Sequence, residues 1–461
     1  MNHHLYFPPD SRIVETCIVG TGGFGRSFIA QARHVPLMNA RVAVDLEAET
    51  AAAALRSAGI EESRIAICAS AAEARTAWDD GRFIAASDLA HVLGLPVEIV
   101  VEATGHPEAA ARHARLAIDA GKHVALVSKE TDSVVGPGLA HRAAANGLVV
   151  TPVDGDQPSL LIGLATWAEV LGFEIVCAGK SSEYDFVFDP ATGRLTSNGV
   201  TVDAPGFGDL LELGDRSTAE LVAARSKAAS ALPQRAVPDL CELGISANAV
   251  GFQPDVPGLH CPILRTAEVP SVLATMSDGG ILSGGRRIDV FHCLRLPGEL
   301  SFAGGVFVVV KCRDESSWQL LVEKGHIQSR NRQTAMLYLP RHLLGLEAAT
   351  SVLEAALKGI SSGAAKPRPH LDLVAVALAD IPAGTVLTAS GHHHSIENVT
   401  ANLVPAAPLA PDAPAPFYLA ANRPLARAVA SGETIRVGDL ALDETSELLS
   451  LRRQQDAVFA A

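Results

Sequence analysis

Short apolar runs alternate with segments of helical periodicity along the first third of the chain. The apolar runs predict strands at residues 16–20, 41–45, 97–103, 123–128 and 148–152, and the periodic segments predict helices at residues 24–33, 49–58, 107–120 and 138–146. Strands that alternate with helices are typical of a parallel sheet with helices on both faces. We therefore predict an α/β protein whose residues 1–153 form a Rossmann doubly wound parallel sheet.

The pattern changes from residue 154 onward. We expect helices at residues 159–171 and 218–231, strands at residues 173–179 and 306–311, and a polar, glycine-rich stretch at residues 181–214. This mixture predicts an α+β domain over residues 154–363 that carries the substrate chemistry and a subunit interface.

A proline-rich segment at residues 364–370 predicts a second domain boundary. Beyond it come short strands and turns, including residues 371–377 and 427–440, and then a helix at residues 444–458. We therefore predict a small β-rich domain over residues 364–461 that ends in a helix.

A glycine-rich turn follows the first predicted strand and opens the first predicted helix. Its sequence, Gly20-Thr21-Gly22-Gly23-Phe24-Gly25, fits the pattern G-x-G-x-x-G, and Asp45 ends the next strand at the expected spacing. Gly20 permits the tight turn, Gly22 allows the backbone to approach a pyrophosphate, and Gly25 lets the helix pack closely on the sheet. The helix N-terminus would then offer amide donors to the phosphates. These features predict a dinucleotide-binding site.

Two further positions bear on the cofactor. A carboxylate at Asp45 would accept hydrogen bonds from the adenosine ribose and repel a 2′-phosphate, and no arginine stands beside it. We therefore favour NAD over NADP. Thr104 and Gly105 follow a later strand, and we expect this small-residue turn to line the nicotinamide side of the cleft.

Composition narrows the choice of partners. The net charge of −14 disfavours a nucleic-acid surface, and the chain has no long apolar run or leader-like N-terminus. Seven scattered cysteines without a C-x-x-C pair predict reduced thiols. We expect a cytoplasmic homo-oligomer that binds a small-molecule substrate, but neither nucleic acid nor membrane.

Hydride transfer from a carbinol needs a base for the hydroxyl proton and a donor for the developing oxyanion. A lysine whose pKa is lowered by burial could serve as either. The candidate catalytic residues are Lys129 and Lys180, each after a predicted strand, Asp156 on the turn between domains, and His260 after a Pro-Gly turn. Weaker polar candidates are Glu242, His326, Arg341 and His342. The histidines 392–394 are expected in a solvated loop, and metal dependence stays open because no metal-ligand spacing is present.

The first half of the chain resembles homoserine dehydrogenase. The matching segments are residues 20–25, the sequence Glu102-Ala103-Thr104-Gly105, and residues 121–129, which end at Lys129. In that family this stretch ends in Ala-Asn-Lys, and the lysine lies beside the substrate. The resemblance therefore implies the same place for Lys129.

Nearly the whole chain resembles the deoxyxylulose-phosphate-reductoisomerase-like proteins. These join a homoserine-dehydrogenase-like front to a C-terminal SAF (β-clip) domain. The shared-looking segments are residues 176–180, 257–260, 278–282, 305–310, 341–347 and 451–457. The resemblance implies an SAF-like fold for the last domain and an oxidoreductase whose reaction is not specified by these motifs.

Three hypotheses follow. The first is an NAD-dependent dehydrogenase or oxidoisomerase that acts on a sugar acid, polyol or hydroxy-aldehyde. The second is an NADPH-dependent reductoisomerase of a sugar phosphate that needs a divalent metal. The third is a dinucleotide-binding sensor without catalysis, which would bind NAD(H) and turn over no polyol.

Overall fold

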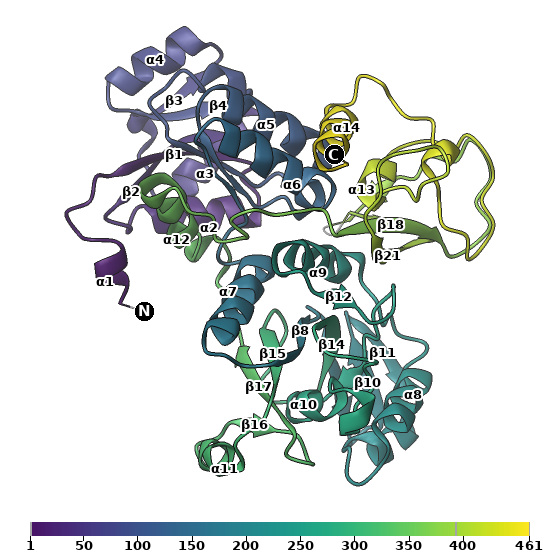
Figure 1. Cartoon of the computed structure of the whole chain (residues 1–461). Helices are drawn as coiled ribbons and strands as arrows, with labels where there is room; N and C mark the ends of the chain where they lie inside the picture. The colour runs from purple at the N-terminus through teal and green to yellow at the C-terminus, as the bar shows by residue number, and fades with distance from the viewer. Residues whose placement is uncertain (1, 392–393, 461) are drawn as a thin grey trace.

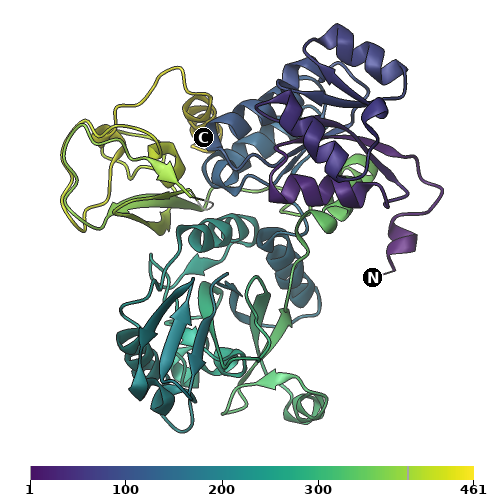
Figure 2. The same ribbon diagram turned by 180° about the vertical axis from the view of Figure 1, so that it is seen from behind.

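The computed structural model describes residues 2–391 and 394–460. Figure 1 shows three units, which are a sheet with flanking helices, a second and larger sheet, and a small β-rich unit near the C-terminus. Figure 2 shows from behind that the small unit lies beside both of the others. This arrangement brings elements of all three units to one region.

The first sheet is parallel throughout, as the sequence predicted. Its strands lie in the order β3 (Ile65–Cys68), β4 (Phe83–Ala86), β2 (Met38–Val44), β1 (Val14–Val19), β5 (Ile99–Glu102), β6 (His123–Leu126) and β7 (Val150–Thr151). The flanking helices are α2 (Gly23–Ala32), α3 (Ala48–Ser57), α4 (Ala71–Asp79), α5 (Pro107–Asp119) and α6 (Lys129–Ala145), and a short α1 (His3–Tyr6) precedes them. The chain reverses its winding direction between β1 and β5, and in such sheets ligands bind at the carboxyl ends of these strands.

Helix α6 begins at Lys129, nine residues before the predicted start, and continues through Pro137. Buried residues lie around most of this helix, so it lacks the one-sided apolar pattern that marks a surface helix. The side-chain amide of Gln455 accepts from the Gly138 N–H at 2.8 Å and donates to the Val134 carbonyl at 3.1 Å. These are the two groups that an uninterrupted helix would pair with each other. The amide therefore replaces one backbone bond next to the proline.

The second sheet has mixed strand directions. Its order is β11 (Val200–Asp203), β10 (Arg194–Ser197), β9 (Phe186–Asp189), β14 (Arg287–Arg295), β8 (Ile175–Ser181), β15 (Val306–Lys311), β17 (Thr334–Leu339) and β16 (Ile327–Gln328), and β12 (Gln253–Pro254) and β13 (Ile263–Leu264) pair with β14. The accompanying helices are α7 (Gln157–Val170), α8 (Thr218–Ala228), α9 (Val237–Val250), α10 (Val269–Val272) and α11 (Glu315–Glu323). The predicted α/β class, with an α+β second unit, is thus confirmed.

The chain returns from this second sheet to the first unit near residue 345. Gly345 lies in a short helical turn, η6 (Leu344–Leu346), against α2, where a Cβ would come within 2.6 Å of the Phe24 carbonyl and the Phe28 amide nitrogen. Helix α12 (Ala349–Leu353) follows, and its buried Val352 packs in the core of the first unit. Helix α2, which follows the glycine turn, is therefore packed closely against the returning chain.

The third unit is built on an antiparallel pair, β18 (Leu371–Ala377) and β21 (Val399–Pro405). Its other regular elements are β19 (Ala389–Ser390), β20 (Ser395–Ile396), α13 (Phe417–Ala420) and α14 (Glu447–Phe459). Helix α14 packs on α5 and α6 of the first unit, and a backbone bond of 2.7 Å joins Leu403 N–H to the Pro257 carbonyl of the second. Within the described residues, the structure has no helix long and apolar enough to cross a membrane.

Arg452 anchors α14 to the third unit. Its guanidinium donates to both carboxylate oxygens of Asp372 on β18, each at 2.8 Å, and its side chain is 1% exposed. The neighbouring Arg453 is 52% exposed and pairs with Glu444 at the surface. The two arginines therefore allow the effect of burial on the strength of an ion pair to be compared within one helix.

We expect Arg452→Met to lower the free energy of unfolding by about 3 kcal/mol or more, because it leaves the Asp372 carboxylate buried without a counter-charge. Arg453→Met should leave it almost unchanged, since exposed ion pairs contribute little. Urea unfolding followed by circular dichroism measures both. Equal losses for the two variants would contradict the assigned role.

Candidate active site

The glycine turn between β1 and α2 has the backbone that a pyrophosphate requires. Gly20 has a φ of +89°, and a Cβ there would lie 2.6 Å from the Ala103 carbonyl oxygen. At Gly22 and Gly23, by contrast, a Cβ would meet nothing within 4 Å. No side chain caps the N-terminus of α2 at Gly22. An open approach to free helix amides fits a bound dinucleotide phosphate.

Asp45 follows β2, as the sequence predicted, and turns back toward the glycine turn. Its carboxylate accepts a hydrogen bond from the Thr21 backbone N–H at 2.8 Å and a second from the Thr21 hydroxyl. This places the carboxylate at the edge where an adenosine ribose would lie in a Rossmann fold. The Leu46 side chain beside it is 90% exposed.

A fully buried carboxylate, Glu102, organises the turns after β5 and β6. It accepts from the Thr104 hydroxyl at 2.7 Å and from the Ser128 hydroxyl, while the Ser128 oxygen accepts the Gly105 N–H at 2.8 Å. The two turns are therefore held together directly beside Lys129. Thr104 and Gly105 lie at the C-terminal edge of the sheet, where the nicotinamide end was predicted.

Lys129 and Lys180 meet at one carboxylate, Glu242. Lys129 is the first residue of α6, Lys180 is on β8, and Glu242 is on α9. The Lys129 ammonium donates to one carboxylate oxygen of Glu242, Oε1, and the Lys180 ammonium donates to the other, Oε2. Lys129 also donates to Asp156 at 3.3 Å, and Lys180 donates to Asp239 at 2.7 Å. Lys180, Asp239 and Glu242 are almost fully buried, whereas the Lys129 side chain is 24% exposed. Lys129 is therefore the most exposed member of the cluster.

The protonation states differ from the sequence-based expectation. Burial alone would lower the pKa of Lys129, but the carboxylates of Asp156 and Glu242 raise it well above its usual value. Burial would likewise lower the pKa of Lys180, but the carboxylates of Asp239 and Glu242 raise it. Burial would raise the pKa of Glu242, but the two ammonium groups lower it. The prediction of a lysine with a lowered pKa was wrong, and Lys129 is a hydrogen-bond donor rather than a neutral base.

His260 lies apart from this contact network. Its ring Nε2 is 3.0 Å from Asp255, and its backbone N–H donates to the buried Asp289. The flanking residues Leu259 and Cys261 have φ values of +58° and +49°, a left-handed backbone that is costly for residues with side chains. Asp289 also accepts the Cys261 N–H at 3.1 Å and so holds the strained loop. Burial raises the pKa of Asp289 to about 6.

Asp239 was not among the predicted site residues, and Glu242 was a weak candidate. The signal was present in the sequence Asp239-Leu240-Cys241-Glu242, because residues three apart lie on the same face of a helix. The helix itself escaped prediction because α9 is buried on most sides and has no polar face. Gln157, beside Asp156, was also missed, and both ends of its buried amide lack hydrogen-bond partners among the described residues.

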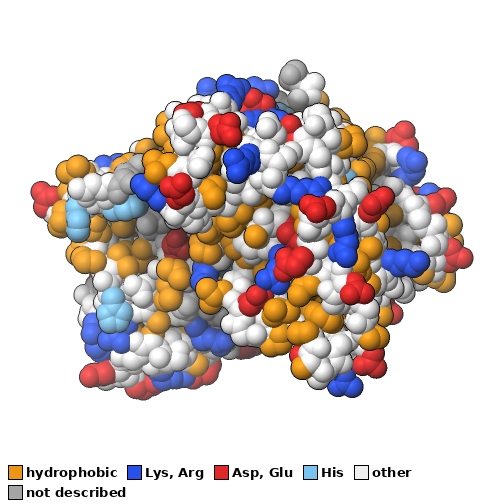
Figure 3. Space-filling view, turned by 90° about the horizontal axis from the view of Figure 1, so that it is seen from below, with side chains coloured by type: hydrophobic (Ala, Val, Ile, Leu, Met, Phe, Trp, Pro, Cys, Tyr) orange, Lys and Arg blue, Asp and Glu red, His pale blue; other side chains and the backbone are white. Residues whose placement is uncertain are grey.

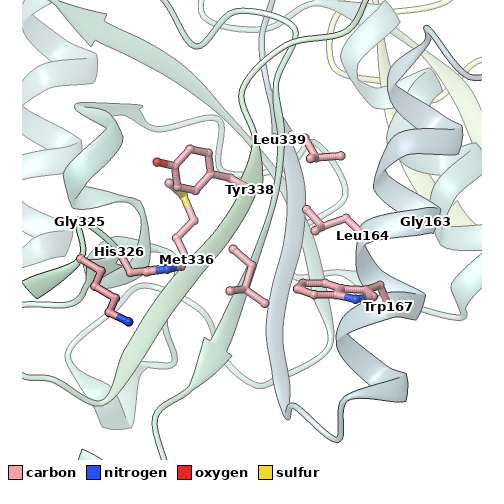
Figure 4. Close-up of a pocket in the computed structure, with 10 residues that line it drawn as sticks. Gly163, Leu164, Trp167, Gly325, His326, Met336, Tyr338 and Leu339 are labelled. Carbon is pink, nitrogen blue, oxygen red and sulfur yellow. The ribbon is translucent and has the colours of Figure 1, made fainter. Parts of the chain in front are cut away.

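A cavity of about 660 Å³ lies elsewhere. It is situated between α7 and β17, with Trp167 on one side and His326 and Tyr338 on the other (Figure 4). Its lining is mostly apolar and contains no member of the lysine cluster. His326 therefore belongs to a different surface from Lys129. Arg341 lies at the surface, and His342 bonds through Nδ1 to the Gly304 carbonyl at 2.9 Å.

Within residues 2–391 and 394–460, no group of three or more His, Cys, Asp or Glu side chains is placed to hold a metal ion. His392 and His393 lie outside the described residues. All seven cysteines are thiols, and six of them are buried.

Residues 237–348 match the family model described as Oxidoreductase DRL, catalytic domain. The match begins at the first residue of α9 and includes Asp239, Glu242 and His260. It covers less than half of the chain and supports an enzyme of the oxidoreductase class. No curated protein matches the chain at a significant level.

Several solved structures are weakly similar to the chain. GenD2 from gentamicin A biosynthesis, in complex with NAD, is 15% identical over 76% of this chain and 88% of that one, with a TM-score of 0.35. Myo-inositol dehydrogenase from Lactobacillus casei, in complex with NAD(H) and myo-inositol, is 16% identical over 37% and 47%, with a TM-score of 0.26. DOX-P reductoisomerase with fosmidomycin and magnesium is 16% identical over 37% and 46%, with a TM-score of 0.27.

The chain spans about half the length of the myo-inositol dehydrogenase and reductoisomerase structures, 47% and 46%. Likenesses at this level carry no argument about what the chain does, so its activity depends on the site itself.

We expect Glu242→Gln to lower the pKa of Lys129, because the ammonium keeps Asp156 but loses a second counter-charge. One pKa unit gives about tenfold more free amine at a pH below the pKa. Labelling with an amine-reactive ester at pH 9, followed by mass spectrometry, should show Lys129 modified roughly tenfold faster in the variant. Exposed Lys227 on α8 is the internal control, and an unchanged ratio of the two rates would contradict the assignment.

Proposed function

We propose that the protein is an NAD-dependent dehydrogenase or oxidoisomerase that acts on a small polyhydroxy compound, such as a sugar acid, polyol or hydroxy-aldehyde. One observation carries this proposal. The Lys129 ammonium is held between two carboxylates at the carboxyl edge of a parallel sheet. The same edge carries a glycine turn with the open backbone that suits a dinucleotide. The match of residues 237–348 to an oxidoreductase catalytic domain supports the same class.

The nicotinamide, when bound, would accept or supply a hydride. Lys129 would donate a hydrogen bond to the substrate oxygen and stabilise the negative charge that develops there, while the Asp156 carboxylate, 3.3 Å from the ammonium nitrogen, would accept the proton that leaves the substrate hydroxyl. Asp156 and Glu242 keep this group protonated and hold it in place. Lys180 is 1% exposed, so we assign it the role of holding Glu242 from behind rather than touching substrate.

We propose NAD rather than NADP because of the end of β2. Asp45, followed by Leu46 and Glu47, would repel a 2′-phosphate, and the described structure places no arginine in contact with the Asp45 carboxylate. The Asp45 carboxylate would instead accept from the ribose hydroxyls after releasing one of its bonds to Thr21.

We also propose a homo-oligomer whose only further partner is its small substrate. The apolar side chains exposed along α7 and β17 support assembly of like chains, with Trp167 at 52%, Val170 at 86% and Leu339 at 40% exposure. Figure 3 shows that acidic and basic side chains alternate among apolar ones on the face seen from below. Such a face does not have the single-sign stripe that nucleic acid requires.

Isothermal titration of the protein with NADH and with NADPH tests the cofactor assignment. We expect NADH to bind more tightly, and Asp45→Ala to reduce this preference by about tenfold, because the variant no longer repels a 2′-phosphate. Glu49→Ala, on the exposed face of α3, serves as the control. Tighter binding of NADPH by the unmodified protein would overturn the NAD assignment, and binding of neither would overturn the oxidoreductase assignment.

Lys129→Met should reduce turnover by about 100-fold while NADH affinity stays within about threefold, since Lys129 lies beyond the phosphate turn. The measurement combines NADH absorbance on a panel of polyols, aldonates and hydroxy-aldehydes with titration of NADH. Lys227→Met is the control. Full activity of the Lys129 variant would rule out its role, whereas combined loss of NADH binding and fold would assign it to structure.

A further inference from the structure

A histidine of the third unit lies against the first unit at the carboxyl edge of its sheet. His394 directly precedes β20 in the hairpin formed by β19 and β20. A Cβ at Gly105 would lie 3.2 Å from the ring Nε2 of His394 and 3.9 Å from its Cδ2, so the imidazole lies directly beside the turn after β5. The sequence suggested a solvated loop for histidines 392–394, whereas His394 is half-buried in this contact.

Further bonds fix the hairpin to the first unit close to this contact. The side-chain oxygen of Asn422 accepts the Ala389 N–H of β19 at 3.0 Å. The next residue, Arg423, donates to the Glu108 carboxylate at 3.3 Å, and Glu108 stands three residues after Gly105 on α5. The hairpin and the turn after β5 are therefore held to neighbouring parts of the same anchor, so the position of the imidazole does not depend on the tip of the hairpin alone.

Gly105 lies on the side of the glycine turn away from Asp45. Strand β2, which Asp45 follows, and strand β5, which leads to Gly105, flank β1 on opposite sides. A dinucleotide with its pyrophosphate at the glycine turn and its adenosine at Asp45 would therefore extend its nicotinamide half toward the turn after β5. The Gly105 N–H also donates to the Ser128 hydroxyl oxygen at 2.8 Å, and Ser128 directly precedes Lys129. His394 thus adjoins the region that hydride transfer would use.

The same hairpin also borders the second unit. Ser395 of β20, next to His394, lines a cavity of about 290 Å³ together with Pro238 of α9. Pro238 directly precedes Asp239, a member of the lysine cluster. The hairpin therefore lies close both to the turn after β5 and to the helix that supplies carboxylates to the two lysines.

We propose that His394 contacts the nicotinamide end of the bound cofactor, so that the third unit supplies part of the cofactor site. This inference rests on the proposed function and adds a residue to the same site. Histidine suits this place because its planar ring can pack on the nicotinamide ring, and because its ring nitrogens can donate to or accept from the carboxamide. The third unit would then take part in cofactor binding as well as in packing.

Binding of NADH and of ADP-ribose tests the proposal, because ADP-ribose lacks the nicotinamide but keeps the rest of the cofactor. We expect His394→Ala to weaken NADH binding about fivefold, since it removes one side-chain contact, and to leave the Kd of ADP-ribose within about twofold. Isothermal titration measures both. Acrylamide should also quench the fluorescence of bound NADH more strongly in the variant, because the nicotinamide would be more exposed to solvent.

The control is His370→Ala, which removes an exposed histidine of the same unit that lines a different cavity, beside Phe459. It should change neither affinity nor the quenching of bound NADH. Equal weakening of NADH and ADP-ribose binding by His394→Ala would assign His394 to the structure of the domain, and an unchanged Kd for NADH would show that it does not touch the cofactor. Either result would overturn the inference and leave the NAD assignment intact, whereas binding of neither compound by the unmodified protein would overturn both.

Discussion

The site depends on one buried carboxylate that is shared by two ammonium groups. Glu242 comes from α9, Lys180 from β8 of the second sheet, and Lys129 from the first turn of α6 in the first unit. Removing three charges from water is expensive and is offset only when each finds its partners in good geometry. A cluster of this kind adds little net stability, but it tolerates few arrangements other than the one observed. It therefore sets where the two units meet and keeps Lys129 protonated.

Close backbone packing holds the same junction from the other side. Gly345 lets the returning chain lie against α2 immediately after the phosphate-type turn, and the carbonyl of Leu344 fills the space where Gly155 would carry a side chain. Glu102 joins the turns after β5 and β6 beneath Lys129. The glycine turn, Lys129 and the junction between the units are consequently parts of one packed assembly.

The third unit belongs to this assembly as well. Gln455 replaces a broken backbone bond in α6, and Glu108 at the start of α5 accepts hydrogen bonds from the first residues of α14. Buried Tyr418 on α13 lies close enough to Glu242 and Cys241 for their charges to raise its pKa, after burial as the main cause. A unit attached to the helix that carries Lys129 is well placed to shape the surroundings of that lysine.

Local patterns in the sequence were sufficient for five of the seven strands of the first sheet, the glycine turn, Asp45 and the position of Lys129 after its strand. Each of these features follows from the same short-range pattern, in which an apolar run is followed by a turn of small or polar residues. The strands β3 and β4 were not predicted, and Lys180 lies within β8 rather than after it. The sequence did not reveal α9 or the full length of α6, because helices buried on most sides carry no amphipathic pattern and Pro137 suggested a break. Only the tertiary structure brought Asp239 and Glu242 to the lysines, and only this contact decided that Lys129 is an ammonium donor. A pKa depends on which charges lie within a few ångströms, and residues 113 positions apart in the chain meet there.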